Sequence, residues 1–233
     1  MIENPWTQLR ELTSARIALG RAGHSLPTRE LLAFQLAHAK ARDAVGRALD
    51  PATFAMLRPL FLRSAARDRA TYLRRPDLGR RLDAESAGRI TRGDWDAVLI
   101  VADGLSATAV HRHAMPFMDE LRKELEDWRI AQVCVAEQGR VAIGDEIGER
   151  IGAKLAVVLI GERPGLSSPD SLGVYLTWSP RVGRTDAERN CVSNIRTEGL
   201  DPAMAARRVA AIMRAAREFR LTGVGLNLRP ALG

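Results

Sequence analysis

The pattern of hydrophobic and polar positions changes near residue 93, and the two sides predict different structures. Before this point, apolar residues recur at helical spacing, as with Leu32 and Leu36 on one side of a helix that Thr28 can cap. Asp50-Pro51 is typical of a helix start, because proline is tolerated in the first helical turn. We therefore predict a helical arm over residues 1–92.

After residue 93, apolar runs of strand length alternate with segments that have helical spacing. The runs lie at residues 96–102, 130–136, 154–161 and 172–178. Ser106 can cap the helix after the first run, and Asp201-Pro202 opens a long final helix that we expect to end at Gly223. Continuous apolar runs are expected of strands buried on both faces. The fold class is therefore α/β: a helical N-terminal region followed, over residues 93–233, by a doubly wound, Rossmann-like, mostly parallel sheet.

Composition adds that this is an ordinary globular chain. Its 233 residues are 46% hydrophobic, with a mean hydropathy of −0.14. The apolar runs are far shorter than the roughly 20 residues that a membrane span needs, and the first residues lack the pattern of a signal peptide. Cys134 and Cys191 form neither a metal cluster nor a disulfide framework. We expect a cytoplasmic protein without a membrane partner.

The net charge of +7 comes entirely from the predicted arm. Residues 1–92 carry 17 basic and 9 acidic side chains, whereas residues 93–233 carry 18 and 19. The excess arginines, which lie mainly between Arg58 and Arg92, indicate either a surface that faces solvent or another subunit, or a site for nucleic acid. Phe61 and Tyr72 are the two aromatic residues in that stretch. Aromatic residues for stacking are therefore too few to interleave the arginines, so we expect no nucleic-acid partner.

Ligands of open α/β sheets bind beyond the carboxyl ends of the strands, which selects three loops. Residues 103–106 could be a functional loop or a tight turn with a helix cap, and Gly139 in residues 137–141 could serve a ligand or a left-handed turn. Residues 161–165, with two glycines, a proline and the pair Glu162-Arg163, favour a backbone held close to a ligand. Neither a G-x-G-x-x-G fingerprint nor a Walker A sequence is present, which disfavours a dinucleotide.

Other candidate chemistry is weak. His111 and His113 are two residues apart and point to different sides of a predicted helix, so we predict no metal site. Cys134 fits a core position in a strand, while Cys191 lies in a polar segment where a functional and a structural role are both open. No nucleophile, base and orienting group can be matched, so we assign no catalytic residue.

Six runs of sequence, in order, carry a resemblance to a known family. They are residues 15–23 (ARIALGRAG), 72–82 (YLRRPDLGRRL), 102–106 (ADGLS), 145–148 (DEIG), 161–166 (GERPGL) and 191–195 (CVSNI). Over nearly its whole length the chain resembles the small (light) subunit of ethanolamine ammonia-lyase. The resemblance implies a hetero-oligomer with a large subunit, which converts ethanolamine to acetaldehyde and ammonia. It also implies adenosylcobalamin as cofactor, whose cobalt–carbon bond supplies a radical.

The resemblance further implies that Val141, Glu162 and Cys191 bind the cofactor. Two of these three lie in loops selected above from the strand pattern alone. Val141 would offer backbone groups and van der Waals contact, Glu162 would accept hydrogen bonds, and Cys191 would pack against the cofactor without reacting. The family's catalytic acid–base groups and most ethanolamine contacts are expected in the large subunit.

Members of the family often carry a long N-terminal extension of the sort that could direct the enzyme into a bacterial microcompartment. Here the resemblance begins almost at Met1. We therefore do not expect this chain itself to direct such targeting. Two alternatives stay open at this point: a stand-alone α/β enzyme for a small metabolite, and an arginine-rich nucleic-acid-binding module.

Overall fold

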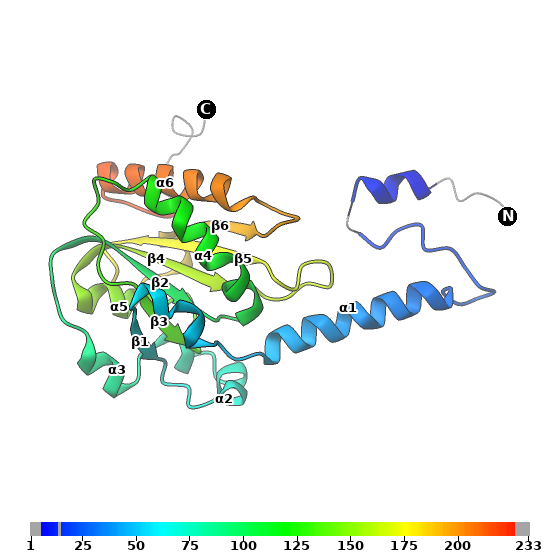
Figure 1. Cartoon of the computed structure of the whole chain (residues 1–233), viewed down its shortest axis with the longest axis horizontal. Helices are drawn as coiled ribbons and strands as arrows, with labels where there is room; N and C mark the ends of the chain where they lie inside the picture. The colour runs from blue at the N-terminus through cyan, green and yellow to red at the C-terminus, as the bar shows by residue number, and fades with distance from the viewer. Residues whose placement is uncertain (1–5, 14, 227–233) are drawn as a thin grey trace.

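The computed structural model describes residues 6–13 and 15–226 as a three-layer α/β body from which a long helix projects (Figure 1). The α-helices are α1 (Thr28–Gly46), α2 (Arg69–Arg74), α3 (Ala84–Arg89), α4 (Ala107–Lys123), α5 (Ile143–Ile151) and α6 (Pro202–Phe219). Short 3₁₀ helices are η1 (Thr7–Glu11), η2 (Pro51–Leu57), η3 (Leu78–Arg80) and η4 (Asp186–Glu188). The strands are β1 (Leu60–Arg63), β2 (Trp95–Ala102), β3 (Cys134–Glu137), β4 (Ala153–Gly161), β5 (Leu172–Trp178) and β6 (Arg189–Ile195).

The six strands form one sheet in the order β1-β3-β2-β4-β5-β6. The first four strands of that order are parallel, and β5 and β6 complete the sheet as antiparallel neighbours. The chain passes from β2 to β3 through α4 and from β3 to β4 through α5, on opposite faces of the sheet. This confirms the predicted mostly parallel, doubly wound α/β fold.

Successive side chains of β2 point to opposite faces of the sheet, so they belong to two separate hydrophobic clusters. Leu99 and Val101 join a cluster with the inner sides of α4 and α6, whereas Val98 and Ile100 join a second cluster with α5. Phe117 and Met118 of α4 are fully buried in the first cluster. Burying a side chain of this size stabilises the fold by about 1.5–3 kcal/mol. The helices therefore cover the sheet on both faces and stabilise it.

Two strands fall where the sequence pattern did not predict them. β1 lies inside the segment that we expected to be helical, and it pairs in parallel with β3. The sheet therefore draws on residues on both sides of position 92. The second strand that was not predicted is β6, which lies in the segment described from the sequence only as polar. Strand β3 also starts later than expected, at Cys134, while Ile130 makes an isolated bridge to Ala97.

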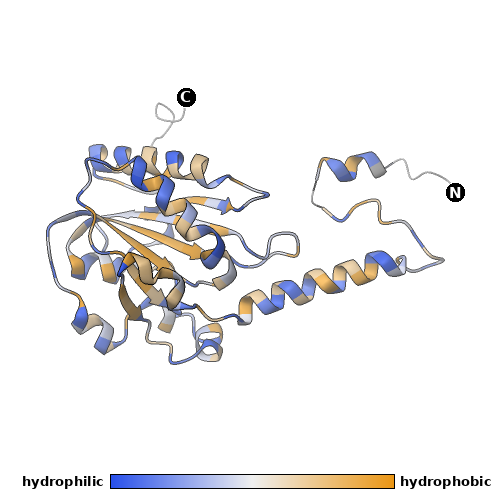
Figure 2. Cartoon of the chain, in the orientation of Figure 1, coloured by the Kyte–Doolittle hydropathy of each residue, from blue (hydrophilic) through white to orange (hydrophobic). Residues whose placement is uncertain are grey.

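The helix predicted after Thr28 is confirmed as α1, but it packs against the body only near its end. Ala41 and Ala44 are the buried residues of this helix, and Figure 1 shows the rest of α1 extending away from the sheet. Apolar residues lie along its exposed surface (Figure 2). In the described part of the chain, no helix is long and apolar enough to cross a membrane.

Candidate functional site

All six strands reach the same edge of the sheet. β1, β2, β3 and β4 end there, and β5 begins there beside the end of β4. β6 also ends there, since Ile195 pairs with Leu172. All three loops selected from the sequence lie at this edge. The structure separates them by role.

The loop at residues 103–106 has a structural role, because its side chains bind the neighbouring loops. Asp103 is almost fully buried; its carboxyl group accepts the backbone N–H of Gly139 at 3.0 Å and pairs with Arg69 at 3.0 Å. Burial raises the pKa of Asp103 to about 6, although Arg69 opposes the shift. Ser106 caps α4, as predicted, and its hydroxyl donates to Pro169 O at 2.8 Å. These contacts fix the first loop to the second and third.

The glycines of the first and third loops serve close packing. A Cβ atom at Gly161 would collide with the carbonyl oxygen of Ser106, and one at Gly104 would collide with that of Gly161. The backbone N–H of Leu105 donates to Gly161 O at 2.9 Å. The glycine pattern that suggested a ligand therefore marks, at Gly161, a loop-to-loop contact.

Glu162, directly after β4, bridges three strands. Its Oε2 accepts hydrogen bonds from the Ser171 hydroxyl and, at 3.2 Å, from the backbone N–H of Asn194 near the end of β6. Its Oε1 lies beside Gly173, 3.0 Å from the position that a Cβ atom there would occupy. This second oxygen has no hydrogen-bond partner among the described residues, so it can accept one from a ligand.

Tyr175 connects Glu162 to Cys191. Tyr175 lies opposite Cys191 in the β5–β6 pairing, so the two side chains are neighbours on the same face of the sheet. Burial raises the pKa of Tyr175, and Cys191 and Glu162 raise it further. Burial also raises the pKa of the Cys191 thiol. Both groups therefore stay protonated near neutral pH.

Val141 lies on the same side of the sheet. It follows β3, is partly buried, and packs against the hydrophobic cluster that Tyr175 also contacts. The structure thus brings Glu162 and Cys191 together around Tyr175, with Val141 on the same face; we call these four residues the Tyr175 face. The sequence pattern missed Tyr175. Its signal was a phenol hydroxyl in a mostly apolar strand.

The histidines that looked like a metal pair have other contacts. His111 Nε2 accepts the backbone N–H of Asp50 at 2.9 Å, and His113 Nε2 lies 3.6 Å from Asp170 Oδ2. Within residues 6–13 and 15–226, no group of three His, Cys, Asp or Glu residues is placed to hold a metal ion. Cys134 is buried, and burial raises its pKa to about 12. It fits the core role expected for it.

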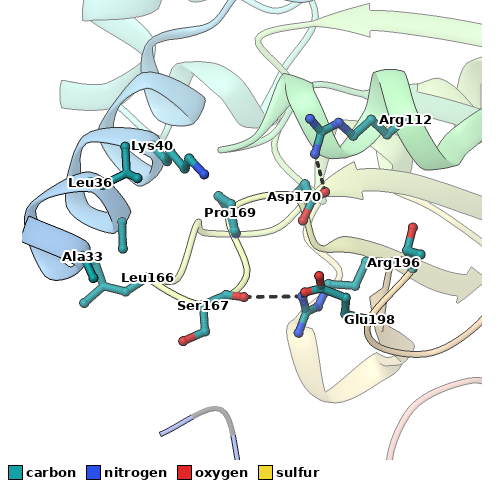
Figure 3. Close-up of a pocket in the computed structure, with 12 residues that line it drawn as sticks. Ala33, Leu36, Lys40, Arg112, Leu166, Ser167, Pro169, Asp170, Arg196 and Glu198 are labelled. Carbon is teal, nitrogen blue, oxygen red and sulfur yellow. Dashed lines mark hydrogen bonds and ion pairs between the residues drawn. The ribbon is translucent and has the colours of Figure 1, made fainter. Parts of the chain in front are cut away.

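A groove of about 570 Å³ separates α1 from the body (Figure 3). Its charged groups pair mainly with each other: Arg112 binds Asp170 at 2.7 Å, and Arg196 binds Glu198 at 3.1 Å. None of Val141, Glu162 and Cys191 lines it. The groove therefore lies where α1 meets the body and is separate from the Tyr175 face.

Comparison with known proteins agrees with the resemblance read from the sequence. A family model described as ethanolamine ammonia-lyase light chain matches residues 3–227. The ethanolamine ammonia-lyase small subunit of Azotobacter vinelandii is 59% identical over 97% of this chain and 88% of its own length. The small subunits of Pseudomonas aeruginosa and Ralstonia nicotianae are each 56% identical, over 97% and 98% of this chain and 88% and 89% of their own lengths.

Proposed function

The chain belongs to the ethanolamine ammonia-lyase light-chain family, and from this premise we propose that its Tyr175 face encloses adenosylcobalamin against the large subunit. The chain is the small subunit of a lyase that acts together with that large subunit. The observation that carries the proposal is the position of Glu162, Cys191 and Val141. They come from three separate parts of the sequence and lie on one side of the sheet, Glu162 and Cys191 beside Tyr175 and Val141 against the hydrophobic cluster that Tyr175 also contacts.

The residues of this face fit such a cofactor chemically. A corrin is a broad, flat ring with an apolar surface and a rim of neutral amides. Tyr175 and Val141 offer partly buried apolar surface, and Glu162 Oε1 offers an acceptor for an amide N–H. Nearby, the buried Nε of Arg140 has no hydrogen-bond partner. A polar ligand would satisfy that donor.

The roles of the residues follow from their environments. Adenosylcobalamin, when bound, supplies the radical that removes hydrogen from ethanolamine. Val141 contributes van der Waals contact, and Glu162 orients the ring edge while bridging β4, β5 and β6. Cys191 packs against the ligand as a neutral thiol, because its raised pKa disfavours the reactive thiolate. Together they position the cofactor and exclude water from it.

The chemistry on ethanolamine itself belongs, in this proposal, to the large subunit. We assign no catalytic acid or base to this chain. A cytoplasmic location, and enclosure in a bacterial microcompartment in some hosts, stay predictions. Family membership favours this function over a stand-alone metabolite enzyme and over a nucleic-acid-binding module. Several arginines of the basic stretch also have acidic partners within the chain, such as Arg63 with Glu137.

Protection of Cys191 from alkylation tests the proposed contact. In the co-purified complex without cofactor, iodoacetamide should modify exposed Cys191, slowly at pH 7 and faster as the pH rises toward the raised pKa of its thiol. Saturating cobalamin should slow the modification at least several-fold, as measured by peptide mass spectrometry. Buried Cys134 should stay unmodified in both samples and serves as the internal control. Equal rates with and without cobalamin would show that the cofactor does not cover this face.

A further inference from the structure

A basic pocket adjoins the Tyr175 face at Val141. It has a volume of about 440 Å³ and lies between η3, the loop after β3 and the segment before β6. Its lining includes Arg80, Arg140, Arg184, Arg189, Val141 and Asp186. Arg189 and Cys191 are alternate residues of β6 and so face the same side of the sheet. The pocket is therefore a continuation of the candidate cofactor site.

Backbone contacts bring Arg80 and Arg140 together from distant parts of the sequence. The backbone N–H of Arg140 donates to Gly79 O at 2.7 Å, and the Tyr72 hydroxyl donates to Gly139 O at 3.0 Å. A Cβ atom at Gly79 would lie 2.8 Å from the Tyr72 ring and 2.9 Å from Arg140 Cγ, so only glycine fits there. The Arg140 guanidinium stacks on Tyr72, 4.4 Å from the ring centre. This stacking fixes its direction.

The charges in the pocket do not balance internally. Arg184 pairs with Glu188, and Arg189 makes two short hydrogen bonds, of 2.6 and 2.7 Å, to the buried carboxylate of Asp145. Asp186, fully exposed at the rim, lies 3.5 Å from Arg189 Nε.

Arg80 and Arg140 have no acidic partner among the described residues, and Arg140 Nε is buried without any hydrogen bond. A buried guanidinium donor left unpaired is costly unless a ligand satisfies it. Two arginines thus line one pocket with their charge available to an anion.

We propose that Arg80 and Arg140 bind the phosphodiester of the cofactor's nucleotide tail. This rests on the proposed function, which places cobalamin on the neighbouring Tyr175 face. The corrin amides are neutral, and the phosphodiester is the anionic group of the cofactor. Guanidinium groups bind phosphate oxygens with short, charge-assisted hydrogen bonds, often two at a time. The site also gives a specific use to Arg80, which lies in the basic stretch between Arg58 and Arg92 that the sequence left as a general charged surface.

Comparison of two corrinoids in the co-purified complex of both subunits tests the proposal. Cyanocobalamin carries the nucleotide tail, whereas dicyanocobinamide keeps the corrin and lacks the phosphodiester. Arg80→Gln and Arg140→Gln should each weaken cyanocobalamin binding about tenfold, measured by equilibrium dialysis with absorbance detection, because each removes a charge-assisted contact. Dicyanocobinamide affinity should stay unchanged. Arg81→Gln, at an exposed neighbour outside the pocket lining, is the matched control and should affect neither ligand.

The other outcomes distinguish a wrong assignment of the phosphodiester from a wrong proposed function. Unchanged cyanocobalamin affinity in both variants would overturn the assignment of the phosphodiester, as would an equal loss for both corrinoids. If the variants instead lost binding of inorganic phosphate, measured by calorimetry, while keeping cobalamin affinity, the pocket would be a site for free phosphate. Binding of neither corrinoid by the unaltered complex would contradict the proposed function itself. Arg80 is exposed, so its variant tests the proposal even if loss of the Arg140 stacking disturbs the fold.

Discussion

At the scale of single residues, Glu162 combines two tasks in one carboxyl group. One oxygen joins the start of β5 to the end of β6 through Ser171 and Asn194. The other oxygen is available to a ligand beside Tyr175. Substitution of Glu162 therefore acts on the local structure as well as on binding, and a test must separate these effects.

Glu162→Ala should raise the apparent dissociation constant for adenosylcobalamin about tenfold and leave kcat largely unchanged. A lost hydrogen bond to a neutral partner costs about 0.5–1.5 kcal/mol, and this loss falls on binding rather than on chemistry. Glu162→Gln should lose less, since it keeps an acceptor oxygen. Ser171→Ala is the control for the bridging role and should change affinity little. A collapse of kcat with unchanged cofactor affinity would instead make Glu162 a catalytic group.

Asp103 gives a prediction about stability and pH. Burial raises its pKa to about 6 from an ordinary value of 3.8, so between these pH values the folded state binds more protons than the unfolded state. The free energy of unfolding should then fall as pH rises from 4 to 6, by about 3 kcal/mol at most, and level off above that. Urea unfolding at several pH values, compared with Asp103→Asn, isolates this contribution. The opposite slope would show that pairing with Arg69 outweighs burial.

At the scale of elements, the sequence predicted strands wherever both faces are buried. β2, β4 and β5 are near-continuous apolar runs, and their positions are confirmed within one residue. β1 has only four residues, LFLR, directly after a helical pattern, and its pairing with β3 is a tertiary contact. α6 ends at Phe219, earlier than the expected Gly223, because Arg220 adopts the left-handed cap conformation.

The candidate site was predictable only in part, for a related reason. The strand-end rule selected the loops of Val141 and Glu162, but two of the loops also contain glycines and an aspartate that serve packing. β6 is polar because Cys191 and Ser193 face an uncovered part of the sheet. The pairing of Tyr175 with Cys191, and of Gly79 with Arg140, joins residues far apart in the sequence. No local pattern records such contacts.

The arm consisting of η1, α1 and the segment between them is an element without a full set of partners in the chain. Fifteen large hydrophobic side chains are exposed in the described residues, and eight of these lie between residues 6 and 36. Such a concentration is typical of an interaction surface. Because the family acts as two kinds of subunit, we expect the arm to contact the large subunit.

Leu32→Glu should weaken association with the large subunit by roughly tenfold or more, since burial of a leucine in an interface is worth about 1.5–3 kcal/mol. Leu32 is 58% exposed in the isolated chain. Gln35→Glu, on the same helix, adds the same charge at a polar position and should have a smaller effect. Interferometry with purified subunits measures both. If light scattering showed that the isolated chain dimerises and that Leu32→Glu abolishes this, the arm would bind a second copy instead.

At the scale of the whole molecule, the structure is that of one subunit of a larger assembly. The α/β body is well packed on both faces of the sheet. Its candidate site is nevertheless only partly covered, and its arm exposes apolar surface. The titratable groups of the Tyr175 face include a tyrosine and a cysteine held protonated near neutral pH. Neutral groups of this kind fit a surface that positions a cofactor without reacting with it. In the proposed function, the partner subunit supplies the groups that react with ethanolamine.

Ammonia release from ethanolamine by separately purified subunits tests this most directly. The assay compares this chain, the large subunit and their mixture, each with and without adenosylcobalamin. We predict turnover only in the mixture with the cofactor. Turnover by this chain alone, or by the mixture without adenosylcobalamin, would contradict the conclusion that it is the cofactor-enclosing small subunit.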